Sequence, residues 1–343
     1  MSSELTMSNP LFLEIPPPPP DKWDWPWTQN YIQDSDQTLV NFTWPKISVV
    51  TPSYNQGQYI EETIRSVLLQ GYPNLEYIII DGGSTDKSVE IIRKYEPWLA
   101  YWVSEKDKGQ CDAINKGWEK SLGDILAWLN SDDFYYPNAL TEAAMVFSQS
   151  EKIEVFCGAV GIVDDNSKKI SIKLPIKPDP IQLFPWGRVP GQPGVFIRRK
   201  IFEELGGPRV DLHYVLDWEY WLRISMNYST KNFVASSQVL AASRDWGNTK
   251  TNLTGSRSAE EARGVLDDLT RHNNITHDMK AMLNYAYAKT WWRQAEFEHL
   301  VGEKRIKKIQ HLFKAISLSP KSFSPYIATR RLLKYLLNSN PPP

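Results

Sequence analysis

The chain has 343 residues, of which 41% are hydrophobic and 23% charged, and its formal net charge is −1. This length allows one large or two ordinary domains with a substantial core, and the near-neutral charge argues against nucleic acid as the main partner. Two cysteines indicate a reducing compartment rather than a disulfide framework, and no apolar stretch reaches the roughly 18 residues that cross a bilayer, so we expect a cytoplasmic globular protein.

Residues 1–45 look like a leader to the main body. Five consecutive prolines, Pro16 to Pro20, favour a stiff polyproline II segment without a packed core. The alternating Trp23, Trp25 and Trp27 would dock this leader on the rest of the protein. A surface arm without function fits the leader equally well.

Apolar, β-branched runs alternate with amphipathic helical patterns from residue 47 onward. Strands are predicted over 47–54, 75–83, 99–105 and 123–133, with helices between them over 59–72, 84–95 and 109–123. Ser84 or Asp86 is expected to be the N-cap of the second helix. The alternation predicts βαβ units and a largely parallel sheet that helices cover on both faces.

The second half of the chain continues with a helix over 138–150 and a strand over 153–161. The proline- and glycine-rich stretch 175–208 is expected to form substrate loops, because part of it reads as a strand and a helix. From residue 256 onward the chain looks helical, and Glu303 to Lys334 contains nine Lys or Arg and one acid. We therefore expect three parts: a leader (1–45), an α/β domain (46–255) and a basic helical extension (256–343).

Polar turns follow each of the first four predicted strands. Their sequences are "TPSYNQG", "DGGSTD", "SEKDKGQ" and "NSDD". Open parallel sheets bind ligands at the carboxyl ends of their strands. One polar turn is unremarkable, but four along one rim indicate a site.

Asp81 ends the apolar run "YIII". An isolated acid at this point is most simply a turn or capping residue. Ser84 and Asp86 are better placed to cap the next helix, which leaves Asp81 to accept hydrogen bonds from a nucleobase or a ribose.

Asp132 and Asp133 are adjacent acids at a strand end. In a partly buried site they would repel each other and their pKa values would rise. Mg²⁺ or Mn²⁺, which is held by one or two carboxylates plus substrate phosphates, would relieve the repulsion. A solvated turn before Pro137 is the alternative.

Asp217 lies in the aromatic and aliphatic context "HYVLDWEYWLRIS". Such surroundings raise the pKa of a carboxylate toward use as a general base. Spacing alone slightly favours a buried ion pair between Asp217 and Arg223. Glu219 is a bystander or a supporting partner in either interpretation.

Together the runs "VVTPSYNQGQYIEETIRSVLLQGYPNLEYIIIDGGSTDKSVEIIRKY", "SEKDKGQCDAINKGW" and "GDILAWLNSDDFYYPNAL" resemble family 2 glycosyltransferases over residues 47–251. These are inverting enzymes of the GT-A fold that use nucleotide sugars. The resemblance implies that Asp133 binds Mn²⁺ or Mg²⁺ and that Asp217 is the catalytic base. It implies a nucleotide site made by Thr51, Pro52, Ser53, Tyr54, Asp81, Gly109 and Asp132.

The resemblance also suggests residues around the two reacting partners. Arg244 and Lys250 are candidates for the diphosphate leaving group, and Trp186, Gln192 and Trp218 for the acceptor side. The segment "SRDWGNTKT" has Trp246 where relatives often have a histidine. The implied reaction moves a sugar from a UDP-, GDP- or dTDP-sugar to a hydroxyl of a glycan or lipid-linked acceptor, in cell-surface polysaccharide or glycan synthesis.

Three other functions compete with sugar transfer as interpretations of the sequence. A sugar-nucleotide nucleotidyltransferase usually has a glycine-rich phosphate loop with a basic residue near the N-terminus, which "TPSYNQGQY" lacks, and a dehydrogenase would need G-x-G-x-x-G after the first strand. A non-catalytic nucleotide-sugar-binding protein would not need Asp81, Asp132, Asp133 and Asp217 together. The basic extension is either a solvated face or a peripheral contact with the inner face of an anionic membrane.

Overall fold

The computed structural model describes residues 15–28, 42–245, 255–273, 275–300 and 305–322. These fall into two compact units. We call the first the sheet unit, which comprises residues 1–177, 190–210 and 229–245. We call the second the helical unit, which comprises residues 178–189, 211–228 and 246–343. The division into a leader, an α/β domain and a helical extension, with boundaries after residues 45 and 255, stays a prediction.

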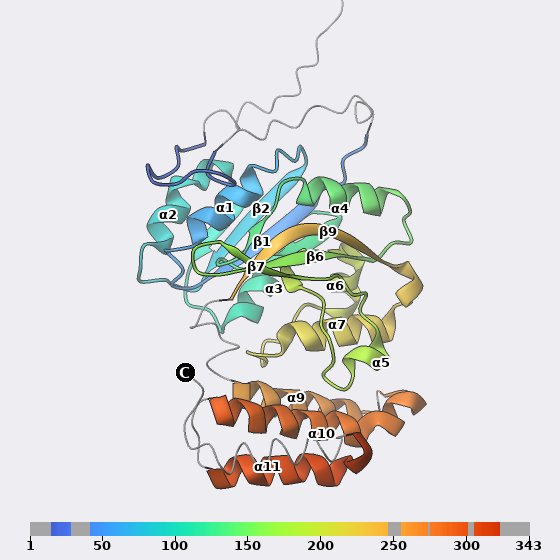
Figure 1. The fold of residues 1–343 in the computed structure, drawn as a ribbon. Helices are drawn as coiled ribbons and strands as arrows, with labels where there is room; N and C mark the ends of the chain where they lie inside the picture. Colours follow the sequence, from blue (N-terminus) through green and yellow to red (C-terminus); the bar gives the residue numbers. More distant parts are fainter. Residues whose placement is uncertain (1–14, 29–41, 246–254, 274, 301–304, 323–343) are drawn as a thin grey trace, which may run out of the picture. The chain divides into compact units, whose positions relative to one another are not determined.

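The sheet unit contains one mixed sheet with the strand order β3-β2-β1-β4-β8-β6-β9-β5, and β7 pairs with β6 (Figure 1). Its strands are β1 (Ile47–Ser53), β2 (Leu75–Asp81), β3 (Tyr101–Ser104), β4 (Ile125–Trp128), β5 (Phe134–Tyr135), β6 (Val155–Val163), β7 (Lys169–Lys173), β8 (Val195–Arg198) and β9 (Phe233–Arg244). β1 to β4 are parallel to one another, as predicted, and β8 joins β4 and β6 in antiparallel pairing. The α/β fold class is confirmed, and the carboxyl ends of β1 to β4 meet at one edge.

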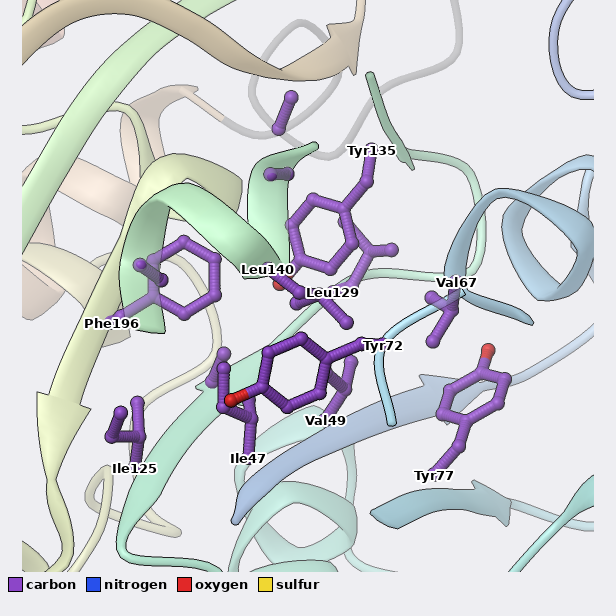
Figure 2. Packing of buried hydrophobic residues seen from close by; sticks show 14 of the residues in the cluster. Ile47, Val49, Val67, Tyr72, Tyr77, Ile125, Leu129, Tyr135, Leu140 and Phe196 are labelled. Carbon is purple, nitrogen blue, oxygen red and sulfur yellow. The ribbon is translucent and has the colours of Figure 1, made fainter. Parts of the chain in front are cut away.

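Helices cover both faces of this sheet. They are α1 (Ile60–Leu68), α2 (Ser88–Lys94), α3 (Gln110–Lys120), α4 (Ala139–Ser148) and α6 (Arg199–Leu205), with 3-10 turns η3 (Glu96–Trp98), η4 (Gln192–Gly194) and η5 (Thr230–Asn232). Alternate residues of a strand point to opposite faces. Ile47 and Val49 therefore join one buried cluster with α1, α2 and α4 (Figure 2), whereas Val50, the next residue, meets α3 on the other face.

Gly117 sets the distance between α3 and β1. A Cβ atom at this position would lie 2.4 Å from a methyl group of Val50. Only glycine permits this approach, so α3 and the loop before it are held close to the sheet.

The described part of the leader is docked on the sheet unit by a buried arginine. Arg65 of α1 donates to the carbonyl oxygens of Pro16, Pro26 and Trp27 at 2.6 to 3.1 Å. Trp25 donates its indole N–H to the carbonyl of Tyr135 at 2.7 Å. Docking through tryptophan is confirmed for Trp25 and Trp27, whereas Trp23 is exposed.

The helical unit consists of α5 (Pro180–Leu183), α7 (Leu216–Asn227), α9 (Gly255–Arg271), α10 (His277–Leu300), α11 (Arg305–Leu318) and the turn η6 (Pro320–Ser322). The seam between α10 and α11 is filled by Trp292, Ala295, Leu312 and Ala315. Among the helices that the structure describes, none is long and apolar enough to cross a membrane.

Candidate functional site

Hydrogen bonds join the turns after β1 and β2. The amide of Asn55 donates to Ser84 Oγ at 2.8 Å, and the amide of Gly57 donates to Asp86 Oδ2 at 2.8 Å. The residue at the N-cap of α2 is Lys87. Asp86, one position earlier, accepts from the amide of Ser88, the first residue of α2, at 2.9 Å and so performs the expected capping. Ser84 instead binds the turn after β1.

Asp81 ends β2 and is completely buried. Its carboxylate accepts from the amides of Gly83 and Ser84 at 3.1 and 2.8 Å. It also accepts from the hydroxyls of Ser84 and Ser104 at 2.6 and 2.7 Å. Asp81 is thus not free as expected but is held by its own turn and by Ser104, and its contact with a nucleotide stays a prediction.

β1 brings four predicted nucleotide residues to the same rim. Thr51 and Pro52 are buried, and the hydroxyl of Thr51 lies 3.0 Å from that of Tyr77 inside the sheet. Ser53 is buried at the strand end, and among the described residues its hydroxyl has no hydrogen-bond partner. Tyr54 is 62% exposed. Buried polar groups normally have a hydrogen-bond partner. The hydroxyl of Ser53 is therefore available to form a hydrogen bond with a ligand.

Asp133 follows β4 and is only 3% exposed. Its carboxylate accepts from the backbone amide of Arg244 at 3.0 Å and from the side-chain amide of Asn130 at 3.1 Å. Burial, and then the neighbouring charge of Asp132, raise the pKa of Asp133 well above its usual value, although the two hydrogen bonds and Arg244 act in the opposite direction. Asp132 itself is half-buried. The predicted mutual repulsion of the pair is thus present around Asp133.

Arg244 ends β9 with its guanidinium buried beside this acidic turn. It forms an ion pair with buried Glu62 at 2.8 Å and donates to the carbonyl of Asp132 at 2.9 Å. It also donates to the carbonyl of Asp164 at 2.9 Å and to Ser167 Oγ at 3.1 Å. The donors of Arg244 thus hold several parts of the protein together, and its place on the leaving-group side stays a prediction.

Buried polar residues of α1 hold the same turn from the other side. Thr63 donates its hydroxyl to the carbonyl of Asp133 at 2.7 Å, and Ser66 accepts from the amide of Tyr135 at 3.1 Å. Together with Glu62, these side chains form what we call the α1 clamp. The clamp fixes the backbone at and after Asp133 and, through the Glu62–Arg244 ion pair, the amide that binds its carboxylate.

Gln192 lies at the start of η4, next to this turn. It donates to the carbonyl of Trp128 at 2.7 Å and accepts from the amide of Asn130 at 3.1 Å. Gln110, the first residue of α3, donates to Asn130 Oδ1 at 2.7 Å. Gly109 is the N-cap of α3 with φ of 110°, a value that favours glycine. The structure thus joins two predicted site residues, Gln192 and Gly109, to the acidic turn through Asn130 and Gln110.

Asp217 lies in the first turn of α7 in the helical unit and is half-buried. Its Oδ1 accepts from the amide of Trp218 at 2.7 Å. Arg223 pairs with Glu219 at 2.8 Å. Glu219 therefore has a structural role as the partner of Arg223, and the alternative of an Asp217–Arg223 ion pair stays a prediction.

The start of α7 is held by Glu261 of α9. Its carboxylate accepts from three successive backbone amides at 2.7 to 3.3 Å, those of His213, Tyr214 and Val215. Glu261 is therefore a positioning residue for the turn that carries Asp217.

Two predicted acceptor residues are buried in the helical unit. Trp186 and Trp218 lie with ring centroids 6.4 Å apart, and the guanidinium of Arg293 covers Trp186 at 4.4 Å. The indole N–H of Trp218 donates to the carbonyl of Leu183 at 2.7 Å. Both rings are thus buried, and their role on the acceptor side stays a prediction.

The carboxylate of Asp133 and its surroundings suit a hard divalent cation. Within the described parts of the chain, no three His, Cys, Asp or Glu side chains converge as a metal-binding group. Mg²⁺ and Mn²⁺ sites of nucleotide enzymes need only one or two carboxylates, since substrate phosphates complete them. A buried carboxylate with a raised pKa and two neutral amide donors fits such a cation. Lys250 and Trp246 lie outside the described residues.

The α1 clamp and Glu261 were not predicted from the sequence, and Asn130 was predicted only as part of the polar turn "NSDD". A weak signal was available for the clamp, because Glu62, Thr63 and Ser66 flank the apolar positions of an otherwise amphipathic helix. No local signal identifies Glu261, which lies more than forty residues from the amides that it binds.

Comparisons with known proteins agree on one family. A sequence model described as "Glycosyl transferase family 2" matches residues 48–206. A Mycobacterium tuberculosis protein described as an uncharacterized glycosyltransferase is 33% identical over 186 residues, which cover 53% of this chain and 70% of that protein. A Rickettsia typhi protein with the same description is 29% identical over 248 residues, 67% of this chain and 74% of that protein.

Solved structures with the same architecture include two glycosyltransferases. S. aureus TarS, solved with UDP-GlcNAc, has a TM-score of 0.58 at 17% identity and covers 81% of this chain and 82% of its own. The mannosyltransferase PcManGT from Pyrobaculum calidifontis, solved with GDP-Man and Mn²⁺, has a TM-score of 0.55 at 17% identity and covers 86% of each chain. At this identity the likeness shows the fold, which is the expected GT-A type.

Proposed function

The chain belongs to glycosyl transferase family 2, and from this premise we propose that it moves a sugar from a nucleoside-diphosphate sugar to an acceptor hydroxyl with inversion at the anomeric carbon. The observation that carries the proposal is the buried, under-compensated carboxylate of Asp133 on the rim of the sheet. The donors in the TarS and PcManGT structures, UDP-GlcNAc and GDP-Man, support this donor class.

In the proposed site, the sheet rim binds the donor. Asp133, with Asp132 beside it, would hold Mn²⁺ or Mg²⁺, which when bound neutralises the charge that develops on the leaving diphosphate. The hydroxyl of Ser53, which lacks a partner among the described residues, is available to the nucleoside. The remaining proposed nucleotide contacts are Thr51, Pro52, Tyr54 and Gly109, with Asp81 as a minor one because its own turn occupies most of its carboxylate.

Asp217 is the proposed base. It takes the proton of the acceptor hydroxyl while that oxygen attacks the anomeric carbon, and the bond from that carbon to the diphosphate oxygen breaks on the opposite side. One displacement needs one base, and it inverts the configuration. Glu261 supports this role by holding the backbone that precedes α7.

The proposed acceptor is a hydroxyl of a glycan or a lipid-linked sugar, with Gln192 on the acceptor side and the reaction at the cytoplasmic face of a membrane. This fits cell-surface polysaccharide synthesis. α11 exposes Ile306 and Phe313 beside Lys307 and Lys314, which supports the predicted membrane contact of the basic extension.

The proposal is tested first by thermal shift with UDP, GDP and dTDP, each with and without Mn²⁺. We expect one diphosphate to raise Tm in a Mn²⁺-dependent way. Release of pyrophosphate from a nucleoside triphosphate and a sugar phosphate would instead indicate a nucleotidyltransferase.

Asp217→Asn then tests the assigned base. The amide cannot accept the proton, so transfer should fall by about 10²-fold or more while donor affinity stays within about twofold. Glu219→Gln is the control on the same helix, since we expect it to lower stability rather than kcat at saturating donor. A large loss of donor affinity in Asp217→Asn would give Asp217 a structural role instead.

A further inference from the structure

Large apolar side chains are exposed side by side on β7. In the part of the chain that the structure describes, Ile170, Ile172 and Leu174 are 60%, 43% and 60% exposed, and every residue from Lys168 to Leu174 is exposed. The other exposed large apolar residues of the sheet unit are well separated along the chain, for example Leu122 and Met145. A contiguous exposed apolar patch marks an interaction surface, whereas single residues do not.

Lysines border this patch. Lys168 and Lys169 precede Ile170, and Lys177 follows Leu174, all of them exposed. Lys173 points to the other face of the strand, where its ammonium donates to the carbonyl of Pro190 at 3.3 Å. The aliphatic stems of Lys168, Lys169 and Lys177 extend the apolar surface while their ammonium groups reach beyond it. We call the exposed strand and its lysines, residues 168–177, the β7 surface.

The β7 surface is rigidly connected to the candidate donor site. β7 pairs with β6, and the turn between them is held by Arg244, which donates to the carbonyls of Asp164 and Asp165 at 2.9 and 3.2 Å. The same arginine donates to the carbonyl of Asp132 at 2.9 Å. A partner bound at the β7 surface is thus kept at a fixed position relative to the acidic turn.

We propose that the β7 surface binds the surface of an anionic lipid bilayer. Isoleucine and leucine gain free energy in the acyl region, and the surrounding lysines meet lipid phosphates. A soluble polyanion would use the lysines alone and leave the three apolar side chains in water. The inference rests on the proposed function, to which it adds a second membrane contact in the sheet unit, and it needs no sugar transfer to be tested.

A second copy of the chain is the competing occupant, because β7 is an edge strand. Antiparallel pairing of two copies centred on Ser171 would place Lys169 of each opposite Lys173 of the other. Like charges directly opposite each other destabilise a strand pair, and edge lysines commonly prevent such pairing. The charges therefore favour lipid over self-association.

Vesicle sedimentation of the full chain tests the proposal. The probe is phosphatidylcholine vesicles with about one-third phosphatidylglycerol, and pure phosphatidylcholine is the reference. The triple substitution Ile170→Ser, Ile172→Ser and Leu174→Ser should lower the partition coefficient by at least about tenfold. Leu122→Ser, which changes an isolated exposed leucine, should leave it unchanged.

The lysines and α11 are tested in the same assay. Lys168→Gln and Lys169→Gln should each weaken binding about fivefold at low salt. Ile306→Ser with Phe313→Ser should preserve the β7-dependent part of the binding. Hydrolysis of a nucleotide sugar, measured without vesicles, should stay unchanged in the β7 variants, which shows that they fold.

Three results would overturn the proposal. They are absence of wild-type binding to the anionic vesicles, equal binding by the triple serine variant, and a concentration-dependent dimer that the triple variant loses. Loss of sugar transfer in all forms with vesicle binding intact would refute the proposed function but not this inference.

Discussion

Asp81 and Asp133 are buried carboxylates on the same rim of one sheet, yet their surroundings differ. Asp81 accepts four hydrogen bonds from its own turn and from the next strand. Asp133 accepts two from neutral amides, and its pKa is raised by burial and by Asp132. A saturated carboxylate stabilises a turn, whereas an under-compensated one favours a cation.

The difference originates in the elements behind the two acids. The turn after β2 supplies its own donors to Asp81, in the local pattern that aspartate commonly forms. Asp133 instead depends on α1 and β9, which lie far from it in sequence and commit the buried cation Arg244 to Glu62. The protein thus places a guanidinium next to an acid without pairing the two directly, which keeps that acid available.

Asp133→Asn should have the largest effect on activity. The amide is a poor ligand for Mn²⁺, so kcat/KM for transfer should fall by about a thousandfold, or about 4 kcal/mol. Steady-state transfer assays with Mn²⁺ measure this. Asp165→Asn, at an exposed acid in the neighbouring turn, is the control and should remain near wild type, and equal activity of the two variants would refute the metal assignment.

Glu62→Gln should have the next largest effect, on stability. Removing one partner of a buried ion pair leaves Arg244 uncompensated and should lower the free energy of unfolding by about 3 kcal/mol. Urea unfolding measures the change. Glu61→Gln is the matched control on the same helix, because the Glu61–Lys94 pair is partly exposed and should contribute less than about 1 kcal/mol.

The result of Glu62→Gln also decides the role of Arg244. A Glu62→Gln variant with normal stability but weaker binding of the nucleoside diphosphate would indicate that Arg244 contacts the diphosphate leaving group. We expect the opposite pattern.

Asp81→Asn should cost less, about 2 kcal/mol of stability, since an amide group would face donors that now meet a carboxylate. The expected loss of nucleotide affinity is small in comparison, because in this structure the donors of the turn occupy the carboxylate. Urea unfolding and titration with the diphosphate found by thermal shift separate the two effects. A loss of affinity without a loss of stability would show that Asp81 exchanges its internal donors for the nucleobase.

The sequence predicted the sheet rim well because its signals are local. Each apolar run ends in a polar turn, and the parallel order of β1 to β4 brings these turns together. The burial and pairing of Arg244, Trp186 and Trp218 could not be predicted in the same way, because they depend on partners that are distant in sequence. Glu62 and Arg244, for example, are separated by 182 positions.

A pH series on the metal-free protein should show the smallest effect and the most specific one. The pKa of Asp133 is higher in the folded chain than its ordinary value of 3.8. The folded state therefore keeps this proton longer than the unfolded state, and its contribution to stability is present below about pH 4 and lost as pH rises through the folded pKa. The slope is at most about 1.4 kcal/mol per pH unit.

Urea unfolding in EDTA from about pH 4 to 8 measures this slope. The difference in unfolding free energy between wild type and Asp133→Asn should grow with pH in favour of the variant, whose amide does not ionise. Asp165→Asn should follow wild type. A constant difference across the series would mean that Asp133 ionises as easily as an exposed acid, and the contrast with Asp81 would then have no electrostatic basis.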